Sequence, residues 1–401
     1  MSFGEYYLAK CFSTLCRQHR NYSGSIRRYR FHFIDPKILC FSKEQERHMK
    51  ISRTLDERLS IRFANGKELV IRNFLVGILL LLSAFFLFLI SLNLGTIDTG
   101  LYDFLKLVSG EEINHQSYFA LWDVRLPRLA LAFLIGWSVA VSGAILQPIA
   151  RNPLADPGLF GISHGSLTTT IVLLAFIPTA SRVLITFASL AGGLGTALVL
   201  LALVGNRHSG GLVILLMGIA VATVLASINS FLILYLPTEA SYNASSWMAG
   251  SLFQANWLSV SAFLPLFVFS LVGIFLSGHS LNRYDLGNEL AQSLGEPVIV
   301  SRPLLLLFAV LLSAASVTIV GPLAFLGILA PQLAQFMSGA NGSARLYLSG
   351  LVGANLVIGA DIISKNATTI AMPLGLTTTI IGVPLFIIVL RLKTLRQYFQ
   401  K

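Results

Sequence analysis

Two apolar segments are joined by the polar stretch Gln147-Pro148-Ile149-Ala150-Arg151-Asn152-Pro153-Leu154-Ala155-Asp156-Pro157-Gly158. The apolar segment before this stretch begins near Leu126, and the segment after it begins near Leu159. A proline lacks the backbone N–H and its ring clashes with the preceding helical turn, so three prolines here exclude a continuous helix. The sequence therefore predicts a turn that connects two membrane-length helices.

Composition indicates that the segments around this turn lie in a membrane. The chain has 401 residues, of which 55% are hydrophobic and only 12% are charged, whereas soluble domains carry about 25% charged residues. Apolar runs of about 20 residues, the length that crosses the hydrocarbon, recur along the chain. We predict an all-α polytopic membrane protein with about ten transmembrane helices, over residues 74–94, 126–149, 159–177, 183–204, 212–236, 257–276, 303–320, 323–337, 346–363 and 373–390.

The distribution of charge predicts the orientation of these helices. Residues 1–73 carry a net charge of +8 out of the total of +11. Basic residues beside a membrane span favour the cytoplasmic side, and no recognisable nucleic-acid-binding module accompanies the charge, so no nucleic acid is expected as a partner. Residues 98–123 carry five acidic residues and one lysine, which indicates an outer loop. Both termini are therefore predicted to be cytoplasmic, although Arg182 in an outer turn is an exception.

The first 70 residues form a basic amino-terminal extension to the ten-helix transmembrane domain that we predict at residues 71–396. No apolar stretch precedes residue 69, so the extension is not a signal peptide. It contains all three cysteines, without the spacing of a metal site. Two interpretations remain open: a genuine cytoplasmic extension, disordered in part, or a misassigned upstream start with Met49 as the true initiator.

Two arginines three residues apart, Arg125 and Arg128, lie at the entrance of the second span. Positions three apart share one face of a helix. One interpretation is that both side chains extend to lipid headgroups. The other is that they dock a carboxylate on a soluble partner.

The sequence contains none of the common catalytic patterns. There is no phosphate-binding glycine loop, no HExxH, no paired-carboxylate site and no nucleophile beside a base. His164 is interpreted as a hydrogen-bonded residue at a helix start, so no metal ligand is predicted. Buried ionisable residues in series, which an ion-coupled secondary transporter needs, are also missing from the spans. We therefore predict no catalytic residue and a passive pathway that takes its energy from another protein, with a secondary transporter as the alternative.

Several motifs in one order resemble a known family. They include Arg125-Leu126-Pro127-Arg128, Arg151-Asn152-Pro153-Leu154-Ala155-Asp156-Pro157, Gly161-Ile162-Ser163-His164-Gly165, Gly287-Asn288-Glu289-Leu290-Ala291-Gln292-Ser293-Leu294-Gly295 and Gly321-Pro322-Leu323-Ala324-Phe325-Leu326-Gly327. Together they resemble the FecCD family, the membrane permeases of bacterial type II ABC importers for iron-siderophores, haem and cobalamin. The resemblance covers about residues 70 to 395.

The resemblance implies a fold, a function and a location. It implies the type II ABC importer permease fold and a permease subunit in the bacterial cytoplasmic (inner) membrane. The expected cargo is a ferric siderophore because most relatives carry siderophores, with cobalamin or haem as alternatives. The chain itself would bind no cofactor and would not be an enzyme, since ATP and Mg would bind a separate ATPase dimer.

The resemblance also implies three functional groups of residues. Docking of a periplasmic or lipoprotein substrate-binding protein would involve Arg125, Arg128 and Lys365. The cytoplasmic gate would be formed by Asn152, Pro153 and Leu154. A cytoplasmic segment at residues 278–302 would contain a coupling helix that contacts the ATPase, with Gly287, Glu289, Ala291, Leu294 and Gly295. Membrane lipid would surround the spans.

The sequence departs from the family's pattern at one inner helix. The family's Pro-His with a later arginine is here Pro331-Gln332-Leu333-Ala334-Gln335, so two ionisable groups are missing. This departure suggests that the chain works beside a second, non-identical permease that carries the usual residues. A homodimer is the alternative.

Overall fold

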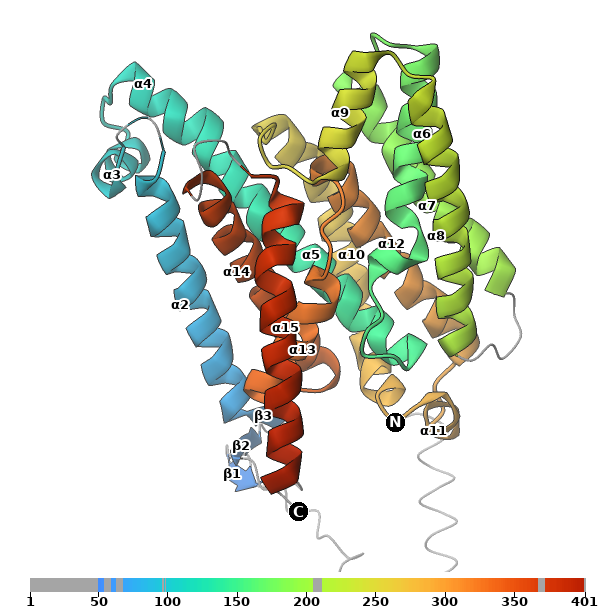
Figure 1. Cartoon of the computed structure of the whole chain (residues 1–401). Coiled ribbons are helices and arrows are strands. Elements are labelled where there is room, and N and C mark those ends of the chain that lie inside the picture. The colour runs from blue at the N-terminus through green and yellow to red at the C-terminus, as the bar shows by residue number, and fades with distance from the viewer. Residues whose placement is uncertain are drawn as a thin grey trace, which may run out of the picture. The chain divides into compact units, whose positions relative to one another are not determined.

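The computed structural model describes residues 50–53, 59–62, 68–95, 97, 99–204, 211–366 and 372–399. Residues 1–49 lie outside the described residues, so the expectations about most of the extension and about Met49 stay predictions. The described part of the permease domain is helical, and a small sheet precedes it (Figure 1).

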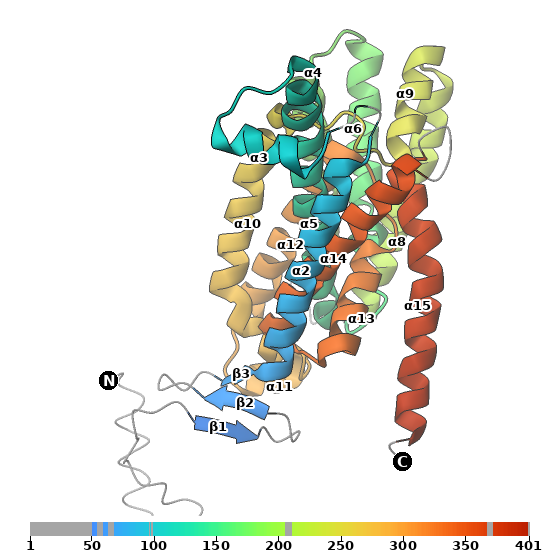
Figure 2. The same ribbon diagram turned by 90° about the vertical axis from the view of Figure 1, so that its left-hand side faces the viewer.

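Three short strands lie between residue 50 and the first helix. They are β1 (Lys50–Arg53), β2 (Leu59–Arg62) and β3 (Glu68–Val70), paired antiparallel in this order. The register pairs Ile51 with Ile61 and Ile61 with Leu69 along the backbone. In Figures 1 and 2 the sheet lies at the same end of the bundle as the end of the last helix.

The helices follow the predicted spans closely. They are α2 (Ile71–Asn93), α3 (Leu101–Ser109), α4 (His115–Tyr118), the π-helix η2 (Phe119–Arg125), α5 (Leu126–Ala150), the 3-10 helix η3 (Pro157–Phe160), α6 (Ile162–Phe176), α7 (Arg182–Val204), α8 (Gly211–Leu234), α9 (Thr238–Met248), α10 (Trp257–Tyr284), α11 (Asn288–Ser293), α12 (Val298–Val320), α13 (Leu326–Ser338), α14 (Gly342–Asn366) and α15 (Leu374–Phe399).

Each of the ten predicted spans coincides with one helix. Among the described residues, eight helices are long and apolar enough to cross a membrane. The two others, α6 with 15 residues and α13 with 13, are shorter. For α13 this agrees with its short apolar run. The protein is a multi-pass membrane protein.

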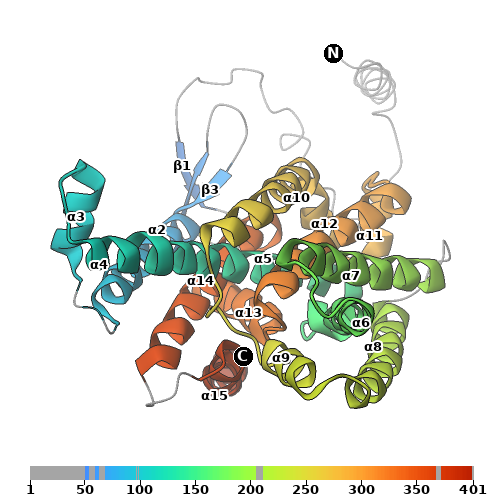
Figure 3. The ribbon, with the colours of Figure 1, turned by 90° about the horizontal axis from the view of Figure 1, so that it is seen from above.

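Helix α5 forms the centre of the bundle (Figure 3). Nearly all of its residues from Ile135 onward are buried. Its backbone approaches α14 so closely that a Cβ added to Gly136 would lie 2.5 Å from the carbonyl oxygen of Gly353, and one added to Gly143 would lie 2.0 Å from that of Gly327 in α13. These two glycines therefore serve packing, because small residues let helices approach closely in membranes. By contrast, α2 and α8 expose most of their apolar side chains.

Candidate functional site

The predicted gate is a compact turn at the end of α5. The helix ends because Arg151 adopts a left-handed conformation, with φ of 50°, as its C-cap. The backbone N–H of Asn152 donates to the carbonyl of Gln147 (3.1 Å), and its side-chain oxygen accepts from the N–H of Leu154 (2.9 Å). The side chain of Leu154 is 46% exposed. The turn thus presents Leu154 while its backbone is held by α5.

Buried amides lie directly behind this turn. Gln147 donates to the carbonyl of Gly327 in α13 (3.2 Å). Gln332 of α13 donates to the Gln147 side-chain oxygen (3.3 Å) and to the carbonyl of Pro153 (3.2 Å). Lys393 of α15 donates to the side-chain oxygens of Gln332 (2.6 Å) and Gln335 (3.1 Å). The two glutamines that mark the sequence departure therefore connect α15, α13 and the gate turn.

A buried carboxyl group closes the same turn. Asp156 is 8% exposed, and its Oδ2 accepts from the N–H of Gly158 (3.2 Å) at the start of η3. Its Oδ1 has no hydrogen-bond partner among the described residues and lies 2.3 Å from where a Cβ on Gly327 would stand. Burial raises the pKa of the Asp156 carboxyl to about 7, although the bond from Gly158 opposes the shift.

The predicted coupling helix is α11, a single short helix between two glycines. Gly287 (φ 97°) and Gly295 (φ 80°) both adopt positive φ, a conformation that glycine adopts without steric cost. Ala291 is fully buried, so it fixes which face of α11 is turned inward. An adjacent side exposes leucines at helical spacing, Leu290 in α11 and Leu286 and Leu294 flanking it, each more than half exposed. Glu289 is also exposed.

Ion pairs and hydrogen bonds anchor this segment to the bundle. Asp285 accepts from the N–H of Gly342 (2.7 Å) and pairs with Arg345 (3.3 Å), both on α14. Arg283 pairs with the buried Glu296 at 2.5 Å. Burial would raise the pKa of Glu296, but hydrogen bonds from serines and the charge and hydrogen bond of Arg283 outweigh it and lower the pKa below its usual value.

A pocket of about 460 Å³ lies between the gate turn and the coupling segment. Its wall includes Pro148 and Arg151 from the end of α5, and Tyr284, Glu289 and Leu290 from the coupling segment. The Arg151 guanidinium reaches Gly287, where an added Cβ would lie 3.0 Å from Nη2. The pocket therefore joins the coupling segment to the end of α5, next to the predicted gate residues, although Asn152, Pro153 and Leu154 do not line it.

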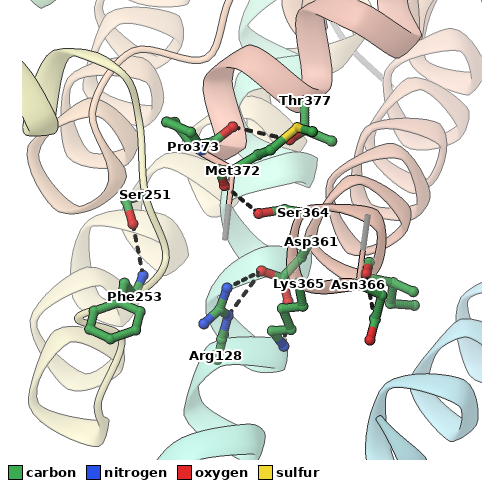
Figure 4. Close-up of polar contacts among 11 residues, drawn as sticks. Arg128, Ser251, Phe253, Asp361, Ser364, Lys365, Asn366, Met372, Pro373 and Thr377 are labelled. Carbon is green, nitrogen blue, oxygen red and sulfur yellow. Dashed lines mark hydrogen bonds and ion pairs between the residues drawn. The ribbon is translucent and has the colours of Figure 1, made fainter. Parts of the chain in front are cut away.

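The predicted docking residues lie at the other end of the bundle and do not form one exposed patch. Arg128 donates to Asp361 Oδ1 through Nε (2.9 Å) and Nη2 (2.7 Å), and Lys365 pairs with Oδ2 of the same carboxylate (2.7 Å). Figure 4 shows Asp361 between the two cations. The Asp361 side chain is 1% exposed, whereas those of Arg128 and Lys365 are 13% and 22% exposed. One buried carboxylate thus orients both cations.

Arg125 makes a different set of contacts. It is the last residue of the π-helix η2, is buried, and donates to the carbonyl oxygens of Leu92, Ile97 (2.6 Å) and Thr99. These bonds attach the connection between α2 and α3 to the start of α5. Arg125 and Arg128 therefore have different partners, although they lie three residues apart. Docking by these residues stays a prediction.

Sequence reasoning assigned Lys365 to docking, but it did not identify Asp361 as the partner of Lys365 and gave Lys393 no role. The i, i+4 spacing of Asp361 and Lys365 was the readable signal for an ion pair. No spacing rule links Lys393 to Gln332, because they lie on different helices. On α8, Asn229 is buried and donates to the carbonyl of His164 (2.9 Å), which accounts for its place within an apolar span.

Comparison with known proteins places this geometry in a family. The model of the FecCD transport family matches residues 64–392. The chain belongs to the FecCD transport family. This confirms the resemblance that the sequence motifs indicated.

Individual relatives are similar over most of their length. The iron(3+)-hydroxamate import system permease protein FhuG of Bacillus subtilis (strain 168) is 33% identical over 314 residues, covering 76% of this chain and 92% of the relative. The Fe(3+) dicitrate transport system permease protein FecD of Escherichia coli (strain K12) is 31% identical over 300 residues, covering 75% and 92%. The cobalamin import system permease protein BtuC of Halobacterium salinarum is 32% identical, covering 68% and 73%.

A solved structure is also similar to this chain. It is described as an inward-facing conformation of a metal-chelate type ABC transporter, with a TM-score of 0.71 and 26% identity. The match covers 79% of this chain and 98% of that chain. The β1–β3 sheet lies largely before the residues that the family model matches.

Proposed function

We propose that this chain is the permease subunit of an ATP-driven ABC importer in the bacterial cytoplasmic membrane. Family membership supports this function, and so does the similarity to permeases named for iron(3+)-hydroxamate, Fe(3+) dicitrate and cobalamin import. We assign a ferric siderophore or similar ferric chelate as cargo, since most of these relatives are named for ferric chelates. The chain breaks no covalent bond of the cargo, and ATP and Mg bind the companion ATPase dimer.

One observation carries the mechanism: Arg151, which precedes the gate turn directly, lines a pocket together with the coupling segment and lies beside Gly287. The exposed leucines of α11 provide an apolar contact for a cytoplasmic partner, since aliphatic anchors are what a partner's pocket takes up. Asp285 and Glu296 attach the segment to the bundle. A movement of the ATPase against α11 is therefore passed to the turn that holds Leu154.

We assign the opposite end of the bundle to the substrate-binding protein. Arg128 and Lys365 bring two positive charges to one buried carboxylate, so one positive charge of the cluster is left for an acidic partner. Charge complementarity of this kind sets partner choice and association rate. Arg125 acts there by holding the α2–α3 connection. A second permease subunit, non-identical by preference, completes the pathway across the membrane.

The coupling role is tested by Leu290→Asp in the complex co-expressed with its ATPase. A charged side chain placed in an apolar contact weakens binding, because the charge loses its hydration and gains no opposite charge in return. We expect loss of ATPase co-purification and of ATP-driven ⁵⁵Fe-chelate uptake into proteoliposomes. Gln292→Asp introduces the same charge at another exposed position of α11 and is the matched control. Normal uptake by Leu290→Asp would contradict the coupling assignment, and uptake without any ATPase would contradict the importer itself.

A further inference from the structure

Lys393 is a cation in an unusual setting. Its Nζ contacts two side-chain oxygens, Gln332 Oε1 at 2.6 Å and Gln335 Oε1 at 3.1 Å. Within the described residues it forms no ion pair with a carboxylate. Its partners are therefore neutral amides, and the short contact to Gln332 has the length of a charge-assisted hydrogen bond.

This cation determines which way the Gln332 amide points. An ammonium group has three donors and no acceptor, so the oxygen of the amide must face Lys393. The amide nitrogen must then face the other way, where it donates to Gln147 Oε1 (3.3 Å) and to the carbonyl of Pro153 (3.2 Å). Because Gln147 accepts there, its own nitrogen donates to the carbonyl of Gly327 (3.2 Å). One positive charge on α15 thus sets the direction of every hydrogen bond up to the gate turn.

We propose that Lys393 is a positioning residue for the inner gate, acting through the orientation of the Gln332 amide on the Pro153 carbonyl. This proposal rests on the proposed function, because that function is what assigns the turn as a gate. Lys393 touches no residue of the turn. Its effect passes through a side chain that is 6% exposed and therefore has little water to replace a lost partner.

The contacts predict different effects for different substitutions. With methionine at 393, nothing charged faces Gln332 Oε1, and the amide is free to reverse and turn its oxygen toward the Pro153 carbonyl, which then lacks a donor. With arginine at 393, a donor and a positive charge remain. Glutamate at 332 keeps the shape and the contact with Lys393, but a carboxylate has no donor for the Pro153 carbonyl.

The test measures how freely the turn is reached by a reagent. Leu154 is replaced by cysteine in a chain whose own Cys11, Cys16 and Cys40 are serine, and the purified chain in lipid nanodiscs is labelled with a membrane-impermeant maleimide. We expect Lys393→Met and Gln332→Glu to raise the labelling rate by about threefold to tenfold, the range expected when one hydrogen bond of ordinary net strength is lost. Lys393→Arg should stay near the starting rate.

Arg391→Met is the matched control, because Arg391 is an exposed cation on the same helix. A labelling rate unchanged in Lys393→Met, raised equally in Arg391→Met, or unchanged in Gln332→Glu would overturn the proposal. Gln332→Glu also covers the case in which Lys393→Met fails to fold, because it retains the lysine. The labelling assay needs neither ATPase nor cargo. If the proposed importer function is wrong, uptake assays will show it, and the labelling rates can still be interpreted.

Discussion

The guanidinium of Arg151 occupies the space in which a side chain at Gly287 would begin, with Nη2 3.0 Å from the position of an added Cβ. Arg151 ends α5 immediately before the gate turn, and Gly287 is the N-cap of the coupling helix α11. Both backbones have positive φ, 50° for Arg151 and 97° for Gly287. The contact joins the two functional segments directly, without an intervening helix.

Gly287→Ala should uncouple ATP hydrolysis from uptake. The added methyl group displaces the Arg151 guanidinium and also strains the backbone, at a cost of about 1–3 kcal/mol. We expect more ATP hydrolysed for each ferric chelate delivered, measured in proteoliposomes that contain the complete transporter. Gly295→Ala is the control, since φ there is 80° and no atom lies within 4 Å of the added Cβ. An equal ATP-to-cargo ratio in the two variants would show that the contact between Arg151 and Gly287 plays no part in coupling. Arg151→Ala combined with Gly287→Ala keeps the strain, removes the collision, and separates the two effects.

Asp361→Asn should destabilise the outer end of the bundle. The substitution leaves Arg128 and Lys365 facing each other without a negative charge at a site where the carboxylate is 1% exposed. Breaking a buried ion pair by removing one partner costs about 3–5 kcal/mol. We expect a lower unfolding temperature in detergent, followed by tryptophan fluorescence. Asp123→Asn removes one charge from an exposed position and should leave the unfolding temperature unchanged. A shift equal to that of the control would mean that the cluster contributes no stability.

The raised pKa of the Asp156 carboxyl predicts that the stability of the protein depends on pH. Its folded pKa is about 7, above the ordinary value of 3.8. Below pH 3.8 the carboxyl is protonated in both states. Stability is then lost as pH rises toward 7, because only the unfolded state ionises freely. The interval between the two pKa values corresponds to about 4 kcal/mol.

Asp156→Asn keeps the side chain neutral at every pH. We therefore expect the unfolding temperature of this variant, relative to the unchanged protein, to rise between pH 5 and pH 8. Asp123→Asn, with the same change in net charge at an exposed position, should show no such rise. A relative unfolding temperature that is independent of pH would contradict the buried neutral carboxyl.

Arg125→Met should loosen the connection between α2 and α3. The methionine fills much of the same space but leaves the carbonyls of Leu92, Ile97 and Thr99 without the donors that Arg125 provides. We expect faster hydrogen–deuterium exchange in residues 94–109, measured by mass spectrometry of the protein in nanodiscs. Arg128→Met is the comparison, because its partner Asp361 lies on α14. Equal exchange in both variants would argue against this role of Arg125.

The span pattern was predictable because apolar runs of membrane length leave few alternatives. All ten predicted spans coincide with helices. The turn after Arg151 was predictable from Pro153 and Pro157, whereas Pro148 lies inside α5. The β1–β3 sheet was not predicted, because its strands are three or four residues long and lie in a charged segment.

The polar contacts were harder to predict, since they join helices that are distant in sequence. The pairing of Arg128 with Asp361 spans 233 residues, and that of Lys393 with Gln332 spans 61. Arg125 is buried against carbonyl groups about 30 residues earlier in the chain, and no residue pattern indicated that contact. Sequence alone placed these side chains near the correct ends of their helices, and only the fold determined their partners.

Helix α10 extends further than its apolar run. Its membrane-length part ends at Leu276, but the same helix continues to Tyr284, a projection of about 12 Å at 1.5 Å per residue. Asn282 on this projection accepts from the N–H of Ser343 (3.1 Å), so the rod is braced before it reaches α11. A displacement of the coupling segment would therefore reach the membrane-length part of α10 along one continuous helix and not through a flexible loop.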